Sequence, residues 1–183
     1  ILEISKIAKE HNALLFLDEV HAVGIYGERG GGLSCGISDH VDIIQGNFAK
    51  AYGVVGGYIA ASKDIIDFIR SFASGFIFTT SLPPMVADAA RESIEILKVD
   101  RTLPKKLFEI TEFLKNELRK TTLPYIETKS HIVPLLVKDP FLCQKLSKEL
   151  LEYGFYLQPI NYPTVPRGME RFRIALTPFH TEK

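Results

Sequence analysis

The stretch ALLFLD, residues 13–18, is a short run of apolar residues that ends in an acid. An uninterrupted run of this length is typical of a strand buried on both faces, and its end is where open α/β sheets bind ligands. Two further apolar runs follow, VDIIQG at residues 41–46 and GGYIAAS at residues 56–62, and a helical pattern covers residues 62–72. Strands separated by helices predict an α/β fold with a mainly parallel sheet flanked by helices.

The rest of the first part of the chain is predicted from periodicity. ILEISKIAKEHN, residues 1–12, is typical of an amphipathic helix whose apolar stripe includes Ile4 and Ile7. GFIFTTS, residues 75–81, is rich in aromatic and β-branched residues and predicts a strand. Two apolar patterns at helical spacing follow, at residues 83–99 and 104–120.

From about Thr122 the pattern changes. A strand is predicted in SHIVPLLVKD (residues 130–139), then a helix that ends at Gly154, and then strands in FYLQPI (residues 155–160) and RFRIALTP (residues 171–178). This order predicts a compact α+β unit. We therefore expect a large-domain part at residues 1–122 and a small C-terminal domain part at residues 123–183.

Composition excludes several classes of protein. The 183 residues are 46% hydrophobic and carry a formal net charge of zero, with basic residues dispersed among equal numbers of acids, which disfavours nucleic acid as a partner. No apolar run is long enough to predict a membrane span. The two cysteines lack metal-ligand spacing and are interpreted as free thiols. The first residue is not Met and both ends interrupt a helical pattern, so an internal piece of a longer protein is expected.

Four residues predict a chemistry when they are taken together. Separately, Asp18 is explained by a turn, His21 by a loop and Lys50 by a solvated surface. A pyridoxal phosphate enzyme, however, needs a lysine to bind the cofactor aldehyde and a carboxylate to keep the pyridine nitrogen protonated. It also benefits from a donor to the phenolic oxygen and an apolar contact on the ring, which His21 and Val20 in DEVH offer.

The glycines near these residues have different predicted roles. Those after Lys50, in AKAYGVVGG, permit tight turns close to the lysine. GERGGG, residues 27–32, lacks the lysine and the strand-to-helix setting of a P-loop, so we interpret it as a flexible connector.

The chain resembles the pyridoxal phosphate-dependent α-oxoamine synthases, which belong to the fold-type-I aminotransferase group. Four stretches match that family in order, and the similarity covers essentially the whole chain: LDEVHAVGIYGERGGG, AKAYGVVGGYIAAS, FIFTTSLPP and PTVPRGMERFR. The resemblance implies that Lys50 is the Schiff-base lysine and general base, that Asp18 pairs with the pyridine nitrogen and that His21 donates to the phenolic oxygen. It also implies that Val20 contacts the cofactor ring.

The resemblance assigns substrate contacts to the C-terminal part. Arg173 matches the family residue that holds the substrate carboxylate, and Thr164 lies in the matching PTVP stretch. Arg171 is the competing candidate. Strand alternation sends Arg171 and Arg173 to the same face, so periodicity does not separate them.

Three further residues are expected at the cofactor phosphate. In the family, a hydroxyl at the position of Thr79 or Thr80 contacts the phosphate of the neighbouring subunit, which implies a homodimer with shared active sites. β propensity alone also explains two threonines there. The family commonly has threonine three residues before the lysine, whereas this chain has Asn47, whose amide can also donate to phosphate.

Within the family, SHIVPLLVKDP and QPINYPTVPRGMERFR are most similar to the members that condense glycine with succinyl-CoA, in the bacterial cytoplasm or the mitochondrial matrix. The members that make 8-amino-7-oxononanoate are the nearest alternative. A non-catalytic α/β interaction module is the alternative of another class, and the intact Lys50, Asp18 and His21 argue against it. Because the family's N-terminal part supplies further cofactor and acyl-CoA contacts, the chain alone is expected to be inactive.

Overall fold

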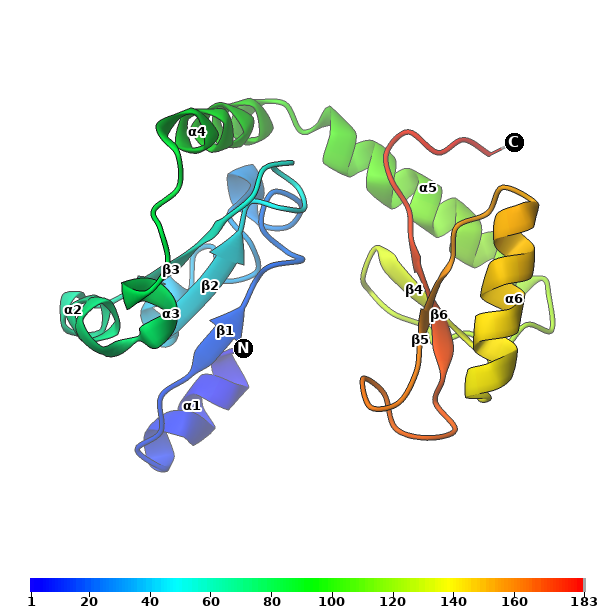
Figure 1. Cartoon of the computed structure of the whole chain (residues 1–183), viewed down its shortest axis with the longest axis horizontal. Helices are drawn as coiled ribbons and strands as arrows, with labels where there is room; N and C mark the ends of the chain where they lie inside the picture. Colours follow the sequence, from blue (N-terminus) through cyan, green and yellow to red (C-terminus); the bar gives the residue numbers. More distant parts are fainter. Residues whose placement is uncertain (183) are drawn as a thin grey trace. The chain divides into compact units, whose positions relative to one another are not determined.

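The structure is a computed structural model that describes residues 1–182. Its contacts divide the chain into two compact units, Ile1–Arg101 and Thr102–Lys183. Figure 1 shows the elements of each unit, and each unit is described by itself. The sequence placed the division after residue 122. The difference is one helix, α5 (Thr102–Arg119), which contacts the first strand of the second unit.

The first unit is an α/β sheet with helices. Strands β1 (Phe16–Asp18) and β2 (Ile43–Asn47) are parallel, and β3 (Gly57–Ala61) pairs antiparallel with β2. The sheet order is β1-β2-β3, so the sheet within this unit is mixed. The remaining elements are the helices α1 (Leu2–Glu10), α2 (Lys63–Phe72), α3 (Ser74–Ile77) and α4 (Pro84–Val99), and the 3-10 turns η1 (Glu28–Gly30) and η2 (Ser38–His40). The predicted α/β class is confirmed.

The second unit is an antiparallel sheet with two helices. Its strands β4 (Ile132–Leu136), β5 (Gln158–Ile160) and β6 (Arg171–Ala175) lie in the order β4-β6-β5. Helix α6 (Pro140–Glu152) contacts β5, and α5 contacts β4. The predicted order of strand, helix, strand, loop and strand is confirmed.

The core of the second unit explains the direction of the side chains on β6. Val133 and Cys143 are fully buried, and Phe172 is almost fully buried. Because successive residues of a strand point to opposite faces, burial of Phe172 leaves Arg171 and Arg173 together on the other face, where both are half-buried. Both arginines are therefore presented by one face of the sheet.

Two predictions of local structure are wrong. Residues 75–81 do not form a strand, because Phe76 N and Ile77 N donate to the carbonyl of Ala73 and close the short helix α3. These local hydrogen bonds satisfy the backbone without a neighbouring strand, so the β propensity of the segment does not decide its structure. Helix α1 is confirmed, but Ile4 and Ile7 of its predicted apolar stripe are more than half exposed in the described unit.

Candidate active site

The predicted cofactor residues of the first unit meet at one edge of its sheet. Asp18 ends β1, and Asn47 ends the parallel strand β2. Gly57, which begins the antiparallel strand β3, is the register partner of Asn47. The ends of parallel strands lie at the same edge, so Asp18, Asn47 and the loop that carries Lys50 share this edge.

The turn after β1 presents Asp18 and His21 at the surface. Oδ1 of Asp18 accepts a hydrogen bond from Val20 N at 2.9 Å, which fixes the direction of the carboxylate. Ala22 N and Val23 N both donate to the carbonyl of Glu19, and this closes the turn around His21. Asp18 and His21 are exposed, and Val20 is half-buried. The turn therefore carries an exposed carboxylate and an exposed imidazole three residues apart.

The loop after β2 presents Lys50. Phe48 N donates to the carbonyl of Gly56 at 2.9 Å, and Val54 N donates to the carbonyl of Phe48 at 2.9 Å, so both ends of the loop are closed by its own backbone. The Lys50 side chain is exposed and makes no hydrogen bond or ion pair with residues 1–182. Its amine is free for a covalent bond to a ligand.

Aromatic side chains support the base of this loop. The ring of Phe48 lies 5.5 Å from that of Tyr58 and 6.2 Å from that of Tyr52. Tyr58 covers Gly46, where an added Cβ would lie 2.3 Å from its Cζ. Burial raises the pKa of Tyr58, and the charge of Glu19 raises it further. Burial also raises the pKa of Tyr52, and the nearby Tyr58 raises it further. Both phenols therefore remain neutral at pH values at which an ordinary tyrosine begins to ionise.

The two loops that carry His21 and Lys50 touch each other. Gly24 has a φ of +80°, and an added Cβ would lie 2.5 Å from Cβ of Ala51. The absence of a side chain at Gly24 therefore permits the close contact. Ala51 follows Lys50 directly, so this contact places the turn of Asp18 and His21 beside the lysine.

Asn47 carries an orphaned polar atom. Its Oδ1 is buried and has no hydrogen-bond partner within the described residues. A carboxamide can present either its oxygen or its NH₂, so the position offers an acceptor or a donor to a ligand at this edge. An unsatisfied buried polar atom is costly, and a ligand that bonds to it removes the cost. Together with the free amine of Lys50 and the oriented carboxylate of Asp18, it makes this edge a good fit for pyridoxal phosphate.

Thr79 and Thr80 are exposed and follow α3. The Thr79 hydroxyl donates to the carbonyl of Gly75 at 2.5 Å, so that oxygen retains acceptor capacity but its proton is engaged. Leu82, further along the segment, lies against Gly56 of the Lys50 loop, where an added Cβ would be 2.9 Å from the leucine methyl carbons. The segment that carries the threonines therefore runs to the edge where Lys50 lies.

The predicted substrate residues belong to the second unit. Arg173 donates to Oε1 of Gln158 on β5, and Nε of Arg171 donates to the carbonyl of Met169 at 2.8 Å. A guanidinium has five N–H donors, so each arginine keeps donors for a ligand. Thr164 is exposed in a turn, and its N donates to the carbonyl of Asn161 at 3.0 Å.

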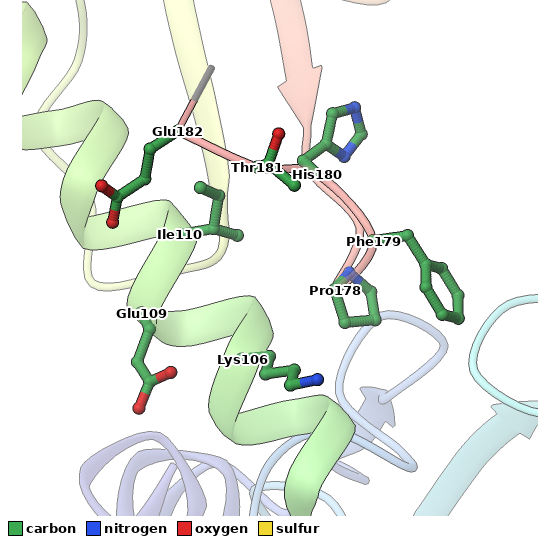
Figure 2. A pocket seen from close by; sticks show the side chains of 8 residues that line it. All are labelled: Lys106, Glu109, Ile110, Pro178, Phe179, His180, Thr181 and Glu182. Atoms are coloured by element: carbon green, nitrogen blue, oxygen red, sulfur yellow. The ribbon is translucent and has the colours of Figure 1, made fainter.

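The second unit also holds a cavity of about 510 Å³. Figure 2 shows Lys106, Glu109 and Ile110 of α5 on one side of it and the segment 178–182 on the other. None of the predicted site residues lines it. Residues 1–182 contain no group of three or more potential metal ligands, and no described helix is long and apolar enough to cross a membrane.

Sequence reasoning missed Glu19. Its side chain is 1% exposed, and its carboxylate accepts hydrogen bonds from the backbone N–H groups of Leu33 and Ser34. These two residues end the glycine-rich loop, residues 27–34. The DE pair contained a signal, because neighbouring residues at a strand end point in opposite directions and only one of two adjacent acids can face the site. The loop predicted as a flexible connector is instead held to β1 by this buried acid.

The chain belongs to the aminotransferase class I and II family, whose family model matches residues 1–183. It is 52% identical over its whole length to 5-aminolevulinate synthase of Rickettsia typhi. The chain spans about half the length of the curated relatives it matches, and the match covers 45% of the Rickettsia typhi protein.

Solved structures agree with this family. A structure described as SPT with a PLP internal aldimine has a TM-score of 0.88 and 29% identity, and the match covers 98% of this chain and 46% of that chain. The 8-amino-7-oxononanoate synthase of Francisella tularensis has a TM-score of 0.79 and 25% identity, with 99% of this chain and 54% of that chain covered. The predicted resemblance to the α-oxoamine synthases is confirmed, and the match to a 5-aminolevulinate synthase is much stronger in sequence than the match to the alternative.

Proposed function

We propose that this chain provides the cofactor-binding edge of an enzyme that uses pyridoxal phosphate to condense glycine with succinyl-CoA, giving 5-aminolevulinate, CoA and carbon dioxide. The observation that carries the proposal is the shared sheet edge of Asp18, Asn47 and the Lys50 loop, in a chain about half identical to 5-aminolevulinate synthase of Rickettsia typhi. When bound, the cofactor accepts the electron pair left by loss of a proton from glycine.

Each residue at this edge has a defined task in the proposal. The Lys50 amine would hold the cofactor aldehyde and, with glycine bound, would take the α-proton of glycine as general base. Asp18, whose direction is fixed by Val20 N, holds a proton on the pyridine nitrogen. His21 donates to the phenolic oxygen, and Val20 contacts the ring. These contacts stabilise the negative charge that develops as the proton leaves.

The phosphate and the substrate carboxylate are assigned to other residues. Asn47 takes the phosphate position at this edge by donating from its amide NH₂, which requires the side chain to turn its NH₂ to the place of the buried, unpartnered Oδ1. Thr79 or Thr80 contacts the phosphate bound by a second copy of the chain in a homodimer, a role supported by the exposure of both threonines. Arg173 holds the substrate carboxylate, and Thr164 contributes to the same substrate site.

Trapping of the lysine tests the cofactor part of the proposal. The holoenzyme that contains this chain is treated with borohydride in the presence of pyridoxal phosphate, and the labelled peptide is mapped. We expect the label on Lys50, loss of label in Lys50→Ala, and unchanged label in the control Lys63→Ala, which removes an exposed lysine from α2. Label spread over surface lysines, with no visible absorbance band, would favour the non-catalytic module instead.

Product analysis tests the reaction itself. The holoenzyme is incubated with a panel of amino acids and acyl-CoA thioesters, and we expect 5-aminolevulinate from glycine and succinyl-CoA to form fastest. A preference for another pair, with Lys50 still labelled, would keep the cofactor and refute the substrate assignment.

A matched pair of substitutions separates the two arginines on β6. Arg173→Lys removes the planar fork that binds a carboxylate through two hydrogen bonds, so the KM of the substrate it holds is expected to rise about ten- to a hundredfold. Arg171→Lys makes the same change on the same face of the same strand and is expected to leave that KM within about twofold, which corresponds to less than about 0.5 kcal/mol. The reverse result would assign the carboxylate to Arg171.

A further inference from the structure

Glu19 is a buried acid that the proposed chemistry does not use. Its side chain is 1% exposed, although it directly follows the exposed Asp18. Oε1 accepts a hydrogen bond from Ser34 N at 2.6 Å, and Oε2 accepts one from Leu33 N at 3.0 Å. A buried carboxylate needs such partners, because an unpaired buried charge is strongly destabilising.

The glycine-rich loop is shaped around this carboxylate. Gly32 has a φ of +89°, and an added Cβ would lie 3.0 Å from the carboxyl carbon and both oxygens of Glu19. The two consecutive N–H groups that follow Gly32 both point at the carboxylate. A glycine at this position therefore lets the loop backbone approach the acid closely.

Glu19 also joins the sheet to the His21 turn. Its N–H donates to the carbonyl of Gln45 on β2 at 2.8 Å, and its carbonyl accepts from Ala22 N at 2.7 Å and from Val23 N at 3.0 Å. One residue thus ties three segments together through different atoms: β2 through its N–H, the His21 turn through its carbonyl, and the glycine-rich loop through its carboxylate.

Arg101 binds the backbone that joins the His21 turn to the glycine-rich loop. Its guanidinium donates to the carbonyl of Gly24 at 2.9 Å and to that of Ile25 at 2.5 Å. Gly24 N in turn donates to the carbonyl of Gly30 at 2.8 Å, and Gly24 packs against Ala51 beside Lys50. The path from Glu19 to the lysine therefore runs through hydrogen-bonded backbone and one close packing contact.

We propose that Glu19 is a positioning residue. Its hydrogen bonds to Leu33 N and Ser34 N keep the His21 turn in packing contact with the Lys50 loop. The proposal rests on the proposed function, because it assigns Glu19 the task of setting the position of His21 relative to Lys50. Glu19 does so without touching substrate or cofactor, since its carboxylate faces the loop and not the exposed side of the edge.

The informative substitution is Glu19→Gln. The shape is nearly unchanged, but the amide NH₂ replaces one acceptor oxygen and faces a backbone N–H, so one of the two hydrogen bonds is lost. The control Glu28→Gln removes the same charge from the exposed surface of the same loop. Arg101→Lys is the second variant. The half-buried guanidinium of Arg101 donates to two carbonyls through two different nitrogens, whereas the single ammonium of lysine lacks this planar pair of donors.

Hydrogen exchange of the backbone amides tests the coupling without any assay of activity. In Glu19→Gln holoenzyme we expect exchange at Leu33 and Ser34 to rise about tenfold or more, and exchange at Phe48 and Val54 in the Lys50 loop to rise with it. Arg101→Lys is expected to raise exchange at Phe48 and Val54 as well, and Glu28→Gln to leave all four amides unchanged. A rise confined to Leu33 and Ser34 would show a local role and overturn the proposal.

Spectroscopy and kinetics of the same variants complete the test. In Glu19→Gln the circular dichroism of Lys50-bound pyridoxal phosphate is expected to change, and kcat to fall about ten- to a hundredfold while KM stays within about twofold. A wild-type dichroism band and kcat would overturn the positioning role even if exchange rises. If the wild-type protein shows no band at all, the proposed function fails, whereas the exchange at Phe48 and Val54 still decides whether Glu19 couples the two loops.

Discussion

The contact between the His21 turn and the Lys50 loop makes a quantitative prediction for Gly24→Ala. Gly24 has a φ of +80°, a region that side chains other than glycine adopt at a cost, and its missing Cβ would lie 2.5 Å from Cβ of Ala51. Cβ of Ala51 is attached directly to the backbone of the Lys50 loop, so it cannot rotate away to relieve the contact. The substitution therefore combines a backbone cost with a packing cost.

The magnitude of each cost follows from the geometry. A left-handed backbone costs an alanine about 1 kcal/mol of free energy of unfolding relative to glycine. Forcing a methyl group into an occupied space adds about 1–3 kcal/mol. Gly36 is the matched control, because its φ is +83° and no atom would lie within 4 Å of an added Cβ. Gly36→Ala has only the first cost, so Gly24→Ala is expected to be more destabilising by about 1–3 kcal/mol.

Urea denaturation of the holoenzyme, followed by far-ultraviolet circular dichroism, measures both free energies of unfolding. The double substitution Gly24→Ala with Ala51→Gly removes the clashing methyl and is expected to recover most of the extra loss, in a double-mutant cycle. Borohydride labelling of Lys50 is expected to slow in Gly24→Ala and to recover in the double variant. Equal destabilisation by Gly24→Ala and Gly36→Ala, with no coupling to Ala51, would refute the contact between the two loops.

Three further outcomes are expected. Burial raises the pKa of Tyr58, so this phenol ionises at lower pH in the unfolded chain than in the folded one. Its contribution to the free energy of unfolding is therefore fully present below about pH 10 and is lost as the pH rises through the folded pKa. Tyr58→Phe is expected to reduce this loss, as measured by urea midpoints across that pH range. Asp139→Ala removes the cap that accepts from Leu142 N at 2.6 Å, and is expected to lower the free energy of unfolding by about 1 kcal/mol, whereas unchanged thermal and urea midpoints would contradict the cap. Burial raises the pKa of the fully buried Cys143 thiol, so iodoacetamide should label the exposed Cys35 first in the native protein, and equal labelling of both would contradict this order.

The position of Asp18 and the Lys50 loop at one edge of the sheet could be predicted from sequence because local patterns identify strand ends. An apolar run that ends in Asp18 predicts a strand end, and a lysine among small residues soon after the next run predicts a loop at the same edge. Parallel pairing of β1 and β2 brings the two together, and the structure has that pairing. The strands of the second unit were predicted in SHIVPLLVKD, FYLQPI and RFRIALTP, and each of these stretches contains a strand in the structure.

Other features depend on hydrogen bonds and contacts that the residue types alone do not specify. GFIFTTS has a strand's composition, but backbone bonds to Ala73 and Ser74 make it a helical turn. Helix α5 looks like a continuation of the first part of the chain, and only its contact with β4 assigns it to the second unit.

The adjacent acids Asp18 and Glu19 show where this division lies. The sequence by itself determined the residue types at the edge: the lysine, the carboxylate and the histidine that the proposed chemistry needs. Only the tertiary structure decided that Asp18 is exposed and Glu19 is 1% exposed, because the loop that buries Glu19 returns from residues 32–34. A pattern of side chains along one strand contains no information about a backbone that arrives from elsewhere, so burial, and with it the role of each acid, is a property of the folded chain.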